Sequence, residues 1–335
     1  MGIEVCKKLD GYYFAMIREI GGYFELELDN RGGFIHDDGL LVNTGRNALE
    51  LILRNLPSDS KVYVPKYTCD VVLEPFAKLG IPYILYSVNK NLELNIDLQL
   101  GDNEYLLYTN YFGVKDSYVR ELVEIYPGKL IVDNAQALYA SPTEMCFYSP
   151  RKFVGIPDGG IAYLNKQISL EEYEQDYSYD RCSHLLKRLD IDAGAGYSDF
   201  KTTANMLRSQ PITRMSNLTK ALLGSIDFAK IRTIRLENFR ALHSVLKDNN
   251  KLVIEGFNEL SCPMVYPFMT DDITLRQRLI NNKIFVAKYW PNIYDCCDEG
   301  DVEYTMCQSI LPLPIDQRYS KEELNRILTL INNKC

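Results

Sequence analysis

The chain lacks the sequence patterns of several common enzyme classes. It has only three histidines, His36, His184 and His243, and no HExxH or other metal-ligand spacing, so we expect no metal site. GxSxG is absent, which argues against a Ser-His-Asp hydrolase. The motifs GxxxxGK[ST] and GxGxxG are absent as well, which excludes a Walker loop and a Rossmann dinucleotide fingerprint.

Long apolar runs and a basic surface are also missing. No uninterrupted apolar run reaches the roughly 18 residues of an ordinary membrane-spanning helix, and the N-terminus shows no apolar core of a signal peptide. The formal net charge is −8, whereas a general nucleic-acid binder needs a basic face for the phosphate backbone. We therefore expect neither a membrane nor a nucleic acid as a partner.

The nine cysteines are an odd number and show no CxxC pair. A zinc site or a disulfide framework is not expected from this pattern, which fits a reducing cytoplasm better. Cys69, in KYTCDVV, is the best candidate for a cysteine nucleophile, but no histidine partner is identifiable.

The remaining composition is that of a globular protein. A chain of 335 residues with 46% hydrophobic content can bury a substantial core and divide into two domains. From about residue 40 to 165, runs rich in Val, Ile and Tyr alternate with helical patterns such as 47–56, which predicts an α/β fold with a largely parallel sheet covered on both faces. In such sheets ligands bind at the carboxyl ends of the strands. The expected strands are 62–66, 82–88, 104–110, 129–134, 144–149 and 160–165.

The second half of the chain has a different pattern. Long helices are expected at 169–188 and 226–248, with a Gly-rich loop at 190–199 between them. Beyond these lie strand candidates and further helices, which predict a small second α/β domain. The expected boundary separates residues 1–245 from 246–335. The strand candidates lie around Val253, Met264 and Ile284, and the helices at 274–281 and 321–331.

One stretch, LIVDNAQALYASPTEMCFYSPRKFVGIPDGG, contains the strongest candidates for chemistry. Asp133 ends an apolar strand, where its charge could keep a pyridine nitrogen protonated, and Gln136 could donate to a ring oxygen. Lys152 could bind a carbonyl group covalently. Taken singly, each has an ordinary explanation: an Asp that ends a strand is often a turn residue or a helix cap, and a lysine is usually a solvated surface charge.

Donors for an anion lie nearby in the sequence. Ser149 precedes the lysine at S-x-x-K spacing, and Arg151 could lower the pKa of the lysine or bind an anion. Upstream, NTGRNALE places Gly45, Arg46 and Asn47 at the start of a helix, whose first N–H groups form an anion site. Taken alone, this last pattern is more often a simple loop-to-helix turn.

The order of these motifs resembles the nucleotide-sugar aminotransferases of the DegT/StrS type, within the pyridoxal phosphate (PLP) enzymes of fold type I. The resemblance covers residues from about 40 to the C-terminal LPLPIDQRYSKEEL. It is carried by NTGRNALELIL, VPKYTCDVVLEPFAKLGI, LIVDNAQA, FYSPRKFVGIPDGG and RMSN before a long helix. Its specific part is the D-x-x-Q motif together with the lysine.

The resemblance implies a large domain with a mainly parallel seven-stranded sheet, a small C-terminal domain and an active site at a homodimer interface. It assigns to Lys152 the covalent bond to PLP, to Asp133 the pyridine nitrogen and to Gln136 the ring hydroxyl. The backbone amides of Gly45, Arg46 and Asn47 would hold the phosphate, and Ser149 resembles the S-x-x-K serine of the wider fold type. Related sugar dehydratases have histidine in place of the lysine, which favours transamination here.

The chain also departs from the family pattern. Phe147 stands where relatives commonly have serine, and Cys69 where an aromatic residue stacks on the cofactor ring, with Tyr67 as a possible substitute. Ile212 replaces an asparagine that contacts the phosphate from the other subunit. Tyr289 and Trp290 could line the substrate pocket.

The resulting hypothesis is a cytoplasmic, homodimeric PLP-dependent aminotransferase of polysaccharide biosynthesis. It would move an amino group from glutamate to a keto group of a nucleotide-linked sugar. Three alternatives remain open: an aminotransferase for a non-sugar ketone, a degenerate fold-type-I protein that binds PLP or a nucleotide sugar without turnover, and a purely structural α/β protein.

Overall fold

A seven-stranded sheet forms the centre of the computed structural model, which describes residues 7–9, 12–14, 20–31, 33–256 and 259–332. The strand order is β3-β9-β8-β7-β6-β4-β5. β9 is antiparallel to both of its neighbours, and every other neighbouring pair in this sheet is parallel. The mainly parallel sheet is therefore confirmed, and each of the six predicted strands overlaps a strand in it. The strands are β3 (Leu40–Val42), β4 (Lys61–Pro65), β5 (Tyr83–Tyr86), β6 (Glu104–Thr109), β7 (Leu130–Asp133), β8 (Cys146–Tyr148) and β9 (Gly160–Tyr163).

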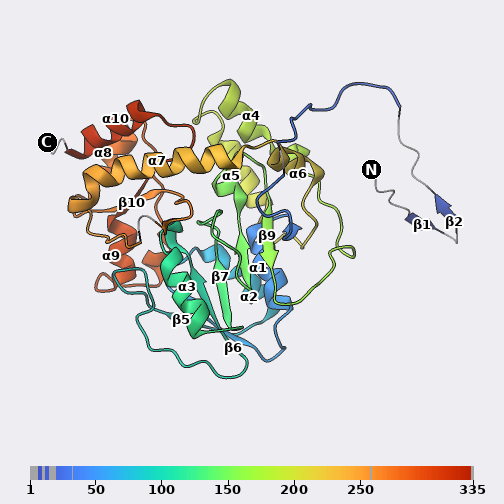
Figure 1. The fold of residues 1–335 in the computed structure, drawn as a ribbon, viewed down its shortest axis with the longest axis horizontal. Coiled ribbons are helices and arrows are strands. Elements are labelled where there is room, and N and C mark those ends of the chain that lie inside the picture. The colour runs from blue at the N-terminus through green and yellow to red at the C-terminus, as the bar shows by residue number, and fades with distance from the viewer. Residues whose placement is uncertain (1–6, 10–11, 15–19, 32, 257–258, 333–335) are drawn as a thin grey trace.

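Two further small sheets and a set of helices complete the described part of the chain (Figure 1). The small sheets are the antiparallel pairs β1 (Lys7–Leu9) with β2 (Tyr12–Phe14) and β10 (Tyr266–Met269) with β11 (Ile310–Leu313). The helices are α1 (Gly45–Arg54), α2 (Glu74–Leu79), α3 (Asp116–Ile125), α4 (Ser183–Asp190), α5 (Tyr197–Met206), α6 (Asn217–Gly224), α7 (Phe228–Leu246), α8 (Leu275–Asn281), α9 (Val302–Ser309) and α10 (Lys321–Asn332).

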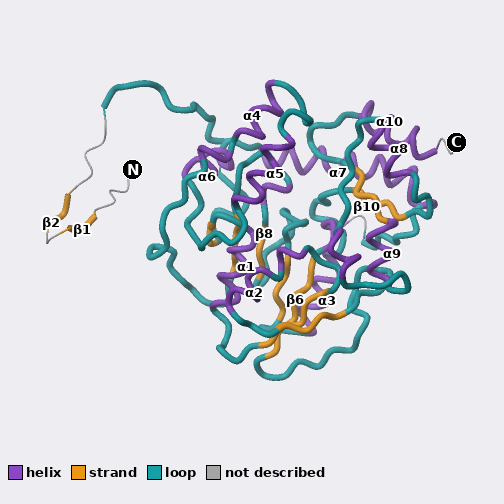
Figure 2. Tube along the Cα trace, turned by 180° about the vertical axis from the view of Figure 1, so that it is seen from behind, coloured by secondary structure: helices purple, strands orange, loops and turns teal. Residues whose placement is uncertain are grey.

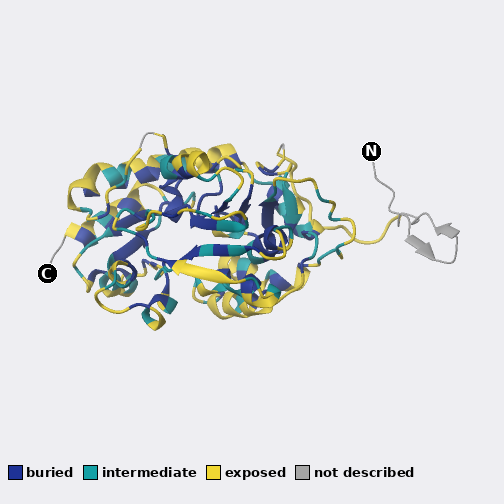
Figure 3. Ribbon diagram, turned by 90° about the horizontal axis from the view of Figure 1, so that it is seen from below, coloured by how far each residue is buried: buried dark blue, intermediate teal, exposed yellow. Residues whose placement is uncertain are grey.

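Each face of the central sheet packs against a separate hydrophobic core. Successive residues of a strand point to opposite faces, so in β6 the side chains of Leu106 and Tyr108 join one core and Leu107 joins the other. The Leu107 core includes apolar residues of α1 and α2, whereas the other includes those of α3, α7 and the C-terminal helices. Buried residues accordingly lie inside the molecule, between helices whose outer faces are exposed (Figure 3). The sheet is thus covered on both faces, as expected.

The start of α1 is fixed by a cap from its own sequence. The Thr44 hydroxyl accepts a hydrogen bond from the backbone N–H of Asn47 at 3.0 Å, which satisfies one of the free donors at the helix terminus. The stripe that includes Leu49 and Ile52 is completely or almost completely buried against the sheet. This packing holds the first turn of α1 at the edge of the sheet where the parallel strands end.

The prediction of a single helix at 169–188 is wrong. Residues 171–172 form a turn, and the segment after it pairs through its backbone with Arg214: Arg214 donates to the Glu174 carbonyl at 2.8 Å, and Asp176 donates to the Arg214 carbonyl at 3.0 Å. Helix α4 begins only at Ser183, and the segment expected as a loop contains the start of α5. Tertiary backbone pairing therefore overrides the helical pattern of the sequence.

The predictions of two strands in the C-terminal part are also wrong. Neither Val253 nor Ile284 lies in a strand, whereas β10 begins close to Met264. After α8 the backbone turns through Lys283, whose φ is 60°, and the Arg276 guanidinium takes the place of a strand partner for the carbonyls of Val286 and Ala287. The helices expected at 226–248, 274–281 and 321–331 are confirmed as α7, α8 and α10.

The described residues 20–31 form an exposed segment that leads away from the body of the molecule (Figures 1 and 3). Its contact with the body includes a hydrogen bond of 2.9 Å from the Arg31 N–H to the Gly224 carbonyl. No helix within the described ranges combines the length and apolar character needed to span a bilayer.

Candidate active site

A cavity of about 950 Å³ lies where β6, β7 and β8 end. This is the sheet edge at which ligands of parallel α/β sheets bind. Seven of the eight predicted site residues line it, namely Gly45, Arg46, Cys69, Asp133, Gln136, Ser149 and Lys152. The eighth, Asn47, does not, because its side-chain amide donates to the Asn43 side chain and to the Pro211 carbonyl, both at 2.7 Å.

Asp133 is the last residue of β7 and is 5% exposed. Its Oδ1 accepts a hydrogen bond from the Ala135 N–H at 2.8 Å, and Thr109 lies opposite it on β6. Burial raises the pKa of Asp133, while the positive charge of Lys152 opposes that rise. A cationic ligand beside this carboxylate would stabilise its charged form.

Gln136 has a buried donor without a partner. The residue is 1% exposed, and its Oε1 accepts from the Phe112 N–H at 2.7 Å, which fixes the orientation of the amide. The Nε2 makes no hydrogen bond within the part of the chain that the structure describes. A buried unsatisfied donor on a cavity wall is suited to a ligand oxygen.

Lys152 lies in the 3₁₀ turn Pro150–Lys152, directly after β8. Its side chain is exposed to the cavity and makes no hydrogen bond or ion pair with the described residues. The next carbonyl, that of Phe153, accepts from Arg235 at 3.1 Å and from Gln317 at 3.0 Å. The backbone of the turn is therefore held in place while the amine is free to react.

The N-terminus of α1 forms another wall of the cavity. Gly160, the first residue of β9, packs so closely on it that an added Cβ would lie 2.1 Å from the Thr44 carbonyl oxygen and 2.6 Å from the Gly45 nitrogen. Ser149 approaches from β8, since a Cβ on Gly45 would lie 3.2 Å from the Ser149 Cβ. The Gly-Gly after the lysine therefore allows the helix terminus to meet the turn that bears Lys152.

The structure also shows where the residues lie that depart from the pattern of the family that the sequence resembles. Cys69 lines the cavity, and burial raises the pKa of its thiol. Tyr67 does not line the cavity: it is fully buried, and its hydroxyl donates to the Tyr289 carbonyl at 2.8 Å. Ile212 is 7% exposed and belongs to the hydrophobic core. Phe147, Tyr289 and Trp290 line the cavity as well.

The sequence alone did not reveal the excess of positive charge in the cavity. Ten lysines and arginines line it against three carboxylates, in a chain whose net charge is −8. Several come from α4, the loop after α8 and α10, which are brought together only by the fold. The cations are Arg46, Arg151, Lys152, Arg188, Arg208, Arg235, Lys283, Lys288, Arg318 and Arg326. Within the described ranges, no three or more His, Cys, Asp or Glu side chains are grouped to hold a metal ion.

No protein-family model and no curated protein matches the chain. Solved structures do. The sugar aminotransferase CalS13 from Micromonospora echinospora is 15% identical with a TM-score of 0.61, over 88% of this chain and 87% of that chain. The putative sugar aminotransferase Spr1654 from Streptococcus pneumoniae, in its PMP form, is 15% identical with a TM-score of 0.61, over 87% and 84%. NtdA from Bacillus subtilis, with bound PMP, is 13% identical with a TM-score of 0.62, over 88% and 73%.

The chain has PLP fold type I. The mainly parallel seven-stranded sheet with helices on both faces is the shared architecture. At this level of identity the similarity establishes the fold, whereas the chemistry has to be argued from the cavity itself.

Proposed function

We propose that the protein is a PLP-dependent aminotransferase. The observation that carries the proposal is that one cavity, in this fold, is lined by a free lysine, a buried carboxylate and a helix N-terminus. The residues fit the cofactor because Gln136 has an unpaired buried donor, Asp133 is a buried carboxylate that a cation would stabilise, and Gly160 leaves room for the close approach at α1.

Each of these residues has a proposed task. Asp133 holds the ring nitrogen protonated, and the Gln136 Nε2 donates to the ring oxygen. The N-terminus of α1 at Gly45 and the Ser149 hydroxyl bind the phosphate. When bound, PLP supplies an aldehyde carbon and an electron-withdrawing ring that together accept an amino group and pass it on. The Lys152 Nζ binds the cofactor at rest and moves the proton to and from the substrate carbon during transfer.

The proposed acceptor is a keto group of a nucleotide-linked sugar, and the proposed donor is glutamate. The positive charge of the cavity supports an anionic acceptor such as a nucleoside diphosphate sugar. Arg188 and Lys283 line the cavity, and their side chains make no hydrogen bond or ion pair with the described residues, so these two charges are available for a diphosphate. The relatives in structure that carry the description sugar aminotransferase point to the same substrate class.

We also propose a homodimer in the cytoplasm, a role in polysaccharide biosynthesis and a domain boundary between residues 245 and 246. The dimer is supported by exposed apolar side chains on and just after α4, whose neighbour α5 contributes Phe200 to the cavity wall. These side chains are Leu186, Leu189 and Ile191, which are 59%, 84% and 67% exposed. The boundary lies one residue before the end of α7 at Leu246.

The decisive experiment is borohydride reduction of the protein loaded with PLP, followed by mass spectrometry of its peptides. We expect the added mass of the reduced cofactor on the peptide that contains Lys152. Lys152→Ala should give no labelled peptide, and Lys166→Ala, which removes an exposed lysine outside the cavity, should be labelled like the wild type. Labelling elsewhere or none at all would refute the proposal.

Glutamate then separates a transaminase from a protein that merely binds PLP. In the absence of an acceptor, we expect glutamate to convert bound PLP to pyridoxamine phosphate, measured by chromatography of the released cofactor. A labelled Lys152 without this conversion would favour the degenerate binding protein. Conversion with no turnover of any nucleotide-linked keto sugar would favour an acceptor outside that class.

A further inference from the structure

The central sheet continues beyond β3, because two further segments pair with it through their backbones. Met215 donates to the Leu41 carbonyl of β3 at 3.0 Å, and Asp176 donates to the Arg214 carbonyl at 3.0 Å. Gln175 therefore lies on the outer of the two segments. Its backbone N–H and C=O groups take no part in the pairing with Arg214 and make no other hydrogen bond with the described residues. Such an unpaired edge is a template for an added strand.

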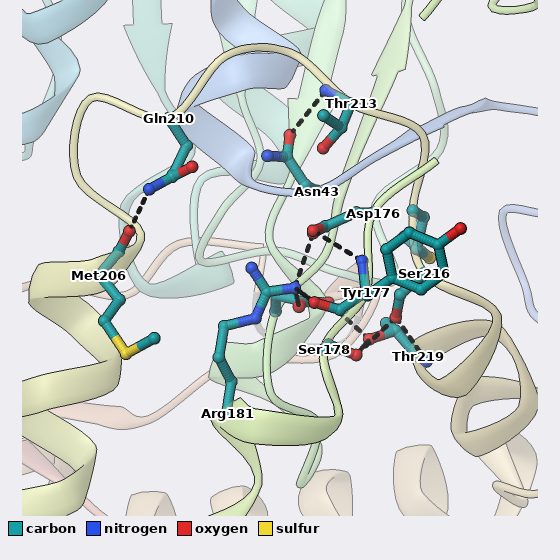
Figure 4. A network of polar contacts seen from close by, with 12 residues as sticks. Asn43, Asp176, Tyr177, Ser178, Arg181, Met206, Gln210, Thr213, Ser216 and Thr219 are labelled. Atoms are coloured by element: carbon teal, nitrogen blue, oxygen red, sulfur yellow. Dashed lines mark hydrogen bonds and ion pairs between the residues drawn. The ribbon is translucent and has the colours of Figure 1, made fainter. Parts of the chain in front are cut away.

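This edge is held firmly on the body of the molecule. In Figure 4 the Arg181 guanidinium is directed at Asp176, to which it donates at 2.7 Å. The hydroxyls of Ser178 and of Ser216, the N-cap of α6, share a hydrogen bond of 2.6 Å. These contacts tie the outer segment to the start of α6, so a strand added at Gln175 would meet a fixed backbone.

Two cations beside the edge, Arg214 and Lys220, have no carboxylate partner among the described residues. Arg214 is in register with Gln175, and its buried Nε makes no hydrogen bond within the part of the chain that the structure describes. Lys220 lies on α6, and its pKa is lowered by burial and by the positive charge of Arg214. A carboxylate brought to this edge would offset the repulsion between the two cations.

The exposed segment of residues 20–31, which we call the arm, has a strand pattern and the matching charge. Phe24 and Leu26 alternate with Glu25 and Glu27, which gives a strand with one apolar and one acidic face. Phe24 and Leu26 are 91% and 66% exposed, and neither glutamate makes an ion pair with the described residues. The arm leads away from the body (Figures 1 and 3), so its own chain covers neither face.

We propose that the arm of one subunit adds as a strand to the sheet edge at Gln175 of a second copy of the chain. The backbone of the arm pairs with the free N–H and C=O groups of Gln175, and Glu25 and Glu27 supply counter-ions for Arg214 and Lys220. The apolar face of the arm leaves the solvent at the same time, which favours the association.

The position of the arm on the body fits such an exchange. Its base is fixed to α6, because the Arg31 N–H donates to the Gly224 carbonyl at 2.9 Å, one helical turn from Lys220. A two-fold axis beside α6 therefore brings each arm to the edge of the other copy, which makes the exchange reciprocal and closed. The edge also leads into α4, whose exposed apolar side chains support the proposed homodimer. The inference deepens that proposal and rests on it.

The first test asks whether the arm reaches a second copy. Two full-length forms with different affinity tags are co-expressed, and only one carries a photo-cross-linking amino acid in place of Leu26. After purification over both tags, illumination should join the arm of one form to residues 170–182 of the other, as mapped by mass spectrometry. The same probe in place of Ile125, an exposed residue of α3, should not label this segment. A cross-link within the chain that carries the probe, or to another surface, would overturn the proposal.

The second test measures the dissociation constant of the dimer by analytical ultracentrifugation. Leu26→Pro removes a backbone donor and prevents the arm from pairing as a strand, so it should raise the dissociation constant about tenfold or more. Leu26→Val retains the strand pattern and should behave like the wild type. Because Leu26 is exposed, neither change removes a buried contact. Equal dissociation constants for the two variants would contradict the exchange.

Charge reversal tests the ion pairs. Glu25→Lys with Glu27→Lys should weaken the dimer about tenfold, since several ion pairs are replaced by repulsion, and Lys220→Glu or Arg214→Glu in the same chain should recover part of the loss. Glu124→Lys, at an exposed position of α3, should have no effect. A dimer that ignores every change in the arm would refute the exchange and leave the homodimer standing, whereas a wild type that stays monomeric would refute both. None of these outcomes involves PLP, so the proposed chemistry is tested separately.

Discussion

At the scale of single residues, Asp133 has a charge that the protein alone does not neutralise. Its carboxylate is buried at the end of β7, and burial raises its pKa above the ordinary value of 3.8. The folded state therefore binds a proton more tightly than the unfolded state does. By linkage, this residue lowers the stability of the cofactor-free protein as the pH rises from the ordinary to the raised pKa, and the loss is complete above the raised value.

Because the buried charge of Asp133 destabilises the folded state, Asp133→Asn is expected to stabilise the cofactor-free protein at neutral pH. The gain should be on the order of 1 kcal/mol for each unit by which the pKa is raised, and it should vanish as the pH falls toward 3.8. Urea unfolding of both proteins between neutral and acidic pH measures it. Asp102→Asn, at an exposed position, is the control and should have no effect at any pH. A variant that is less stable than the wild type at neutral pH would show that the buried charge is already compensated.

The same substitution should weaken the binding of PLP. The amide of Asp133→Asn is neutral and cannot stabilise a protonated ring nitrogen. Stability and cofactor affinity are therefore expected to change in opposite directions, which is typical of a residue retained for function. Cofactor affinity that survives the change would remove Asp133 from the proposed site.

Individual site residues could be predicted from sequence where the residue type and its position at the end of a strand were enough to identify them. Asp133 ends β7 and Lys152 lies in the turn after β8, so the strand pattern placed both at the same edge of the sheet. Asn47 shows where this reasoning stops, because the direction of its side chain is set by Pro211, which is distant in sequence. The ion pair of Arg46 with Glu74 could not be predicted either, because the two residues lie on different helices, α1 and α2.

At the scale of elements, the junction of α1 with β9 depends on the absence of a side chain at Gly160. Gly160→Ala would place a Cβ within 2.1 Å of the Thr44 carbonyl oxygen, and backbone atoms cannot yield as a flexible side chain can. We expect a loss of stability of about 3 kcal/mol, the upper range for overpacking, together with weaker phosphate binding. Urea unfolding and phosphate-dependent melting measure the two effects.

Gly224→Ala is the matched control for that change. Gly224 ends α6, its φ is not positive, and an added Cβ would meet no atom within 4 Å. Alanine at this position should leave stability unchanged or raise it by up to about 1 kcal/mol. If both alanine variants behaved alike, close packing of β9 against α1 would not explain the Gly-Gly of the sequence.

Among elements, the predictable ones have local patterns and the others have partners that are far away in sequence. Helices α1, α7, α8 and α10 and the six expected strands have strong periodicity and were predicted correctly. The error at 169–188 arose because the backbone there pairs with Arg214, a contact that no local pattern reports. Helix α5 was missed because the glycines before Tyr197 suggested a loop throughout.

At the scale of the whole molecule, α7 connects the sheet to the C-terminal elements (Figures 1 and 2). The connection includes Arg235, which is 2% exposed. Its guanidinium donates to the Met264 carbonyl at 3.0 Å, to the Phe153 carbonyl at 3.1 Å and to the Gln317 side chain at 3.1 Å. One side chain thus joins the turn that bears Lys152 to two segments of the C-terminal part.

Arg235→Met should therefore affect both stability and the site. We expect a loss of about 3 kcal/mol, because the buried carbonyls lose charge-assisted hydrogen bonds, and weaker PLP binding because the turn after β8 is no longer held. Arg232→Met, one turn earlier in α7, removes an exposed arginine with a single hydrogen bond to the Ser261 carbonyl and should cost less than about 1 kcal/mol. Urea unfolding and PLP titration of both variants separate two roles. A large loss of stability with unchanged PLP affinity would mean that Arg235 supports the core alone, whereas loss of both would show that the contact between α7 and the C-terminal segments positions Lys152.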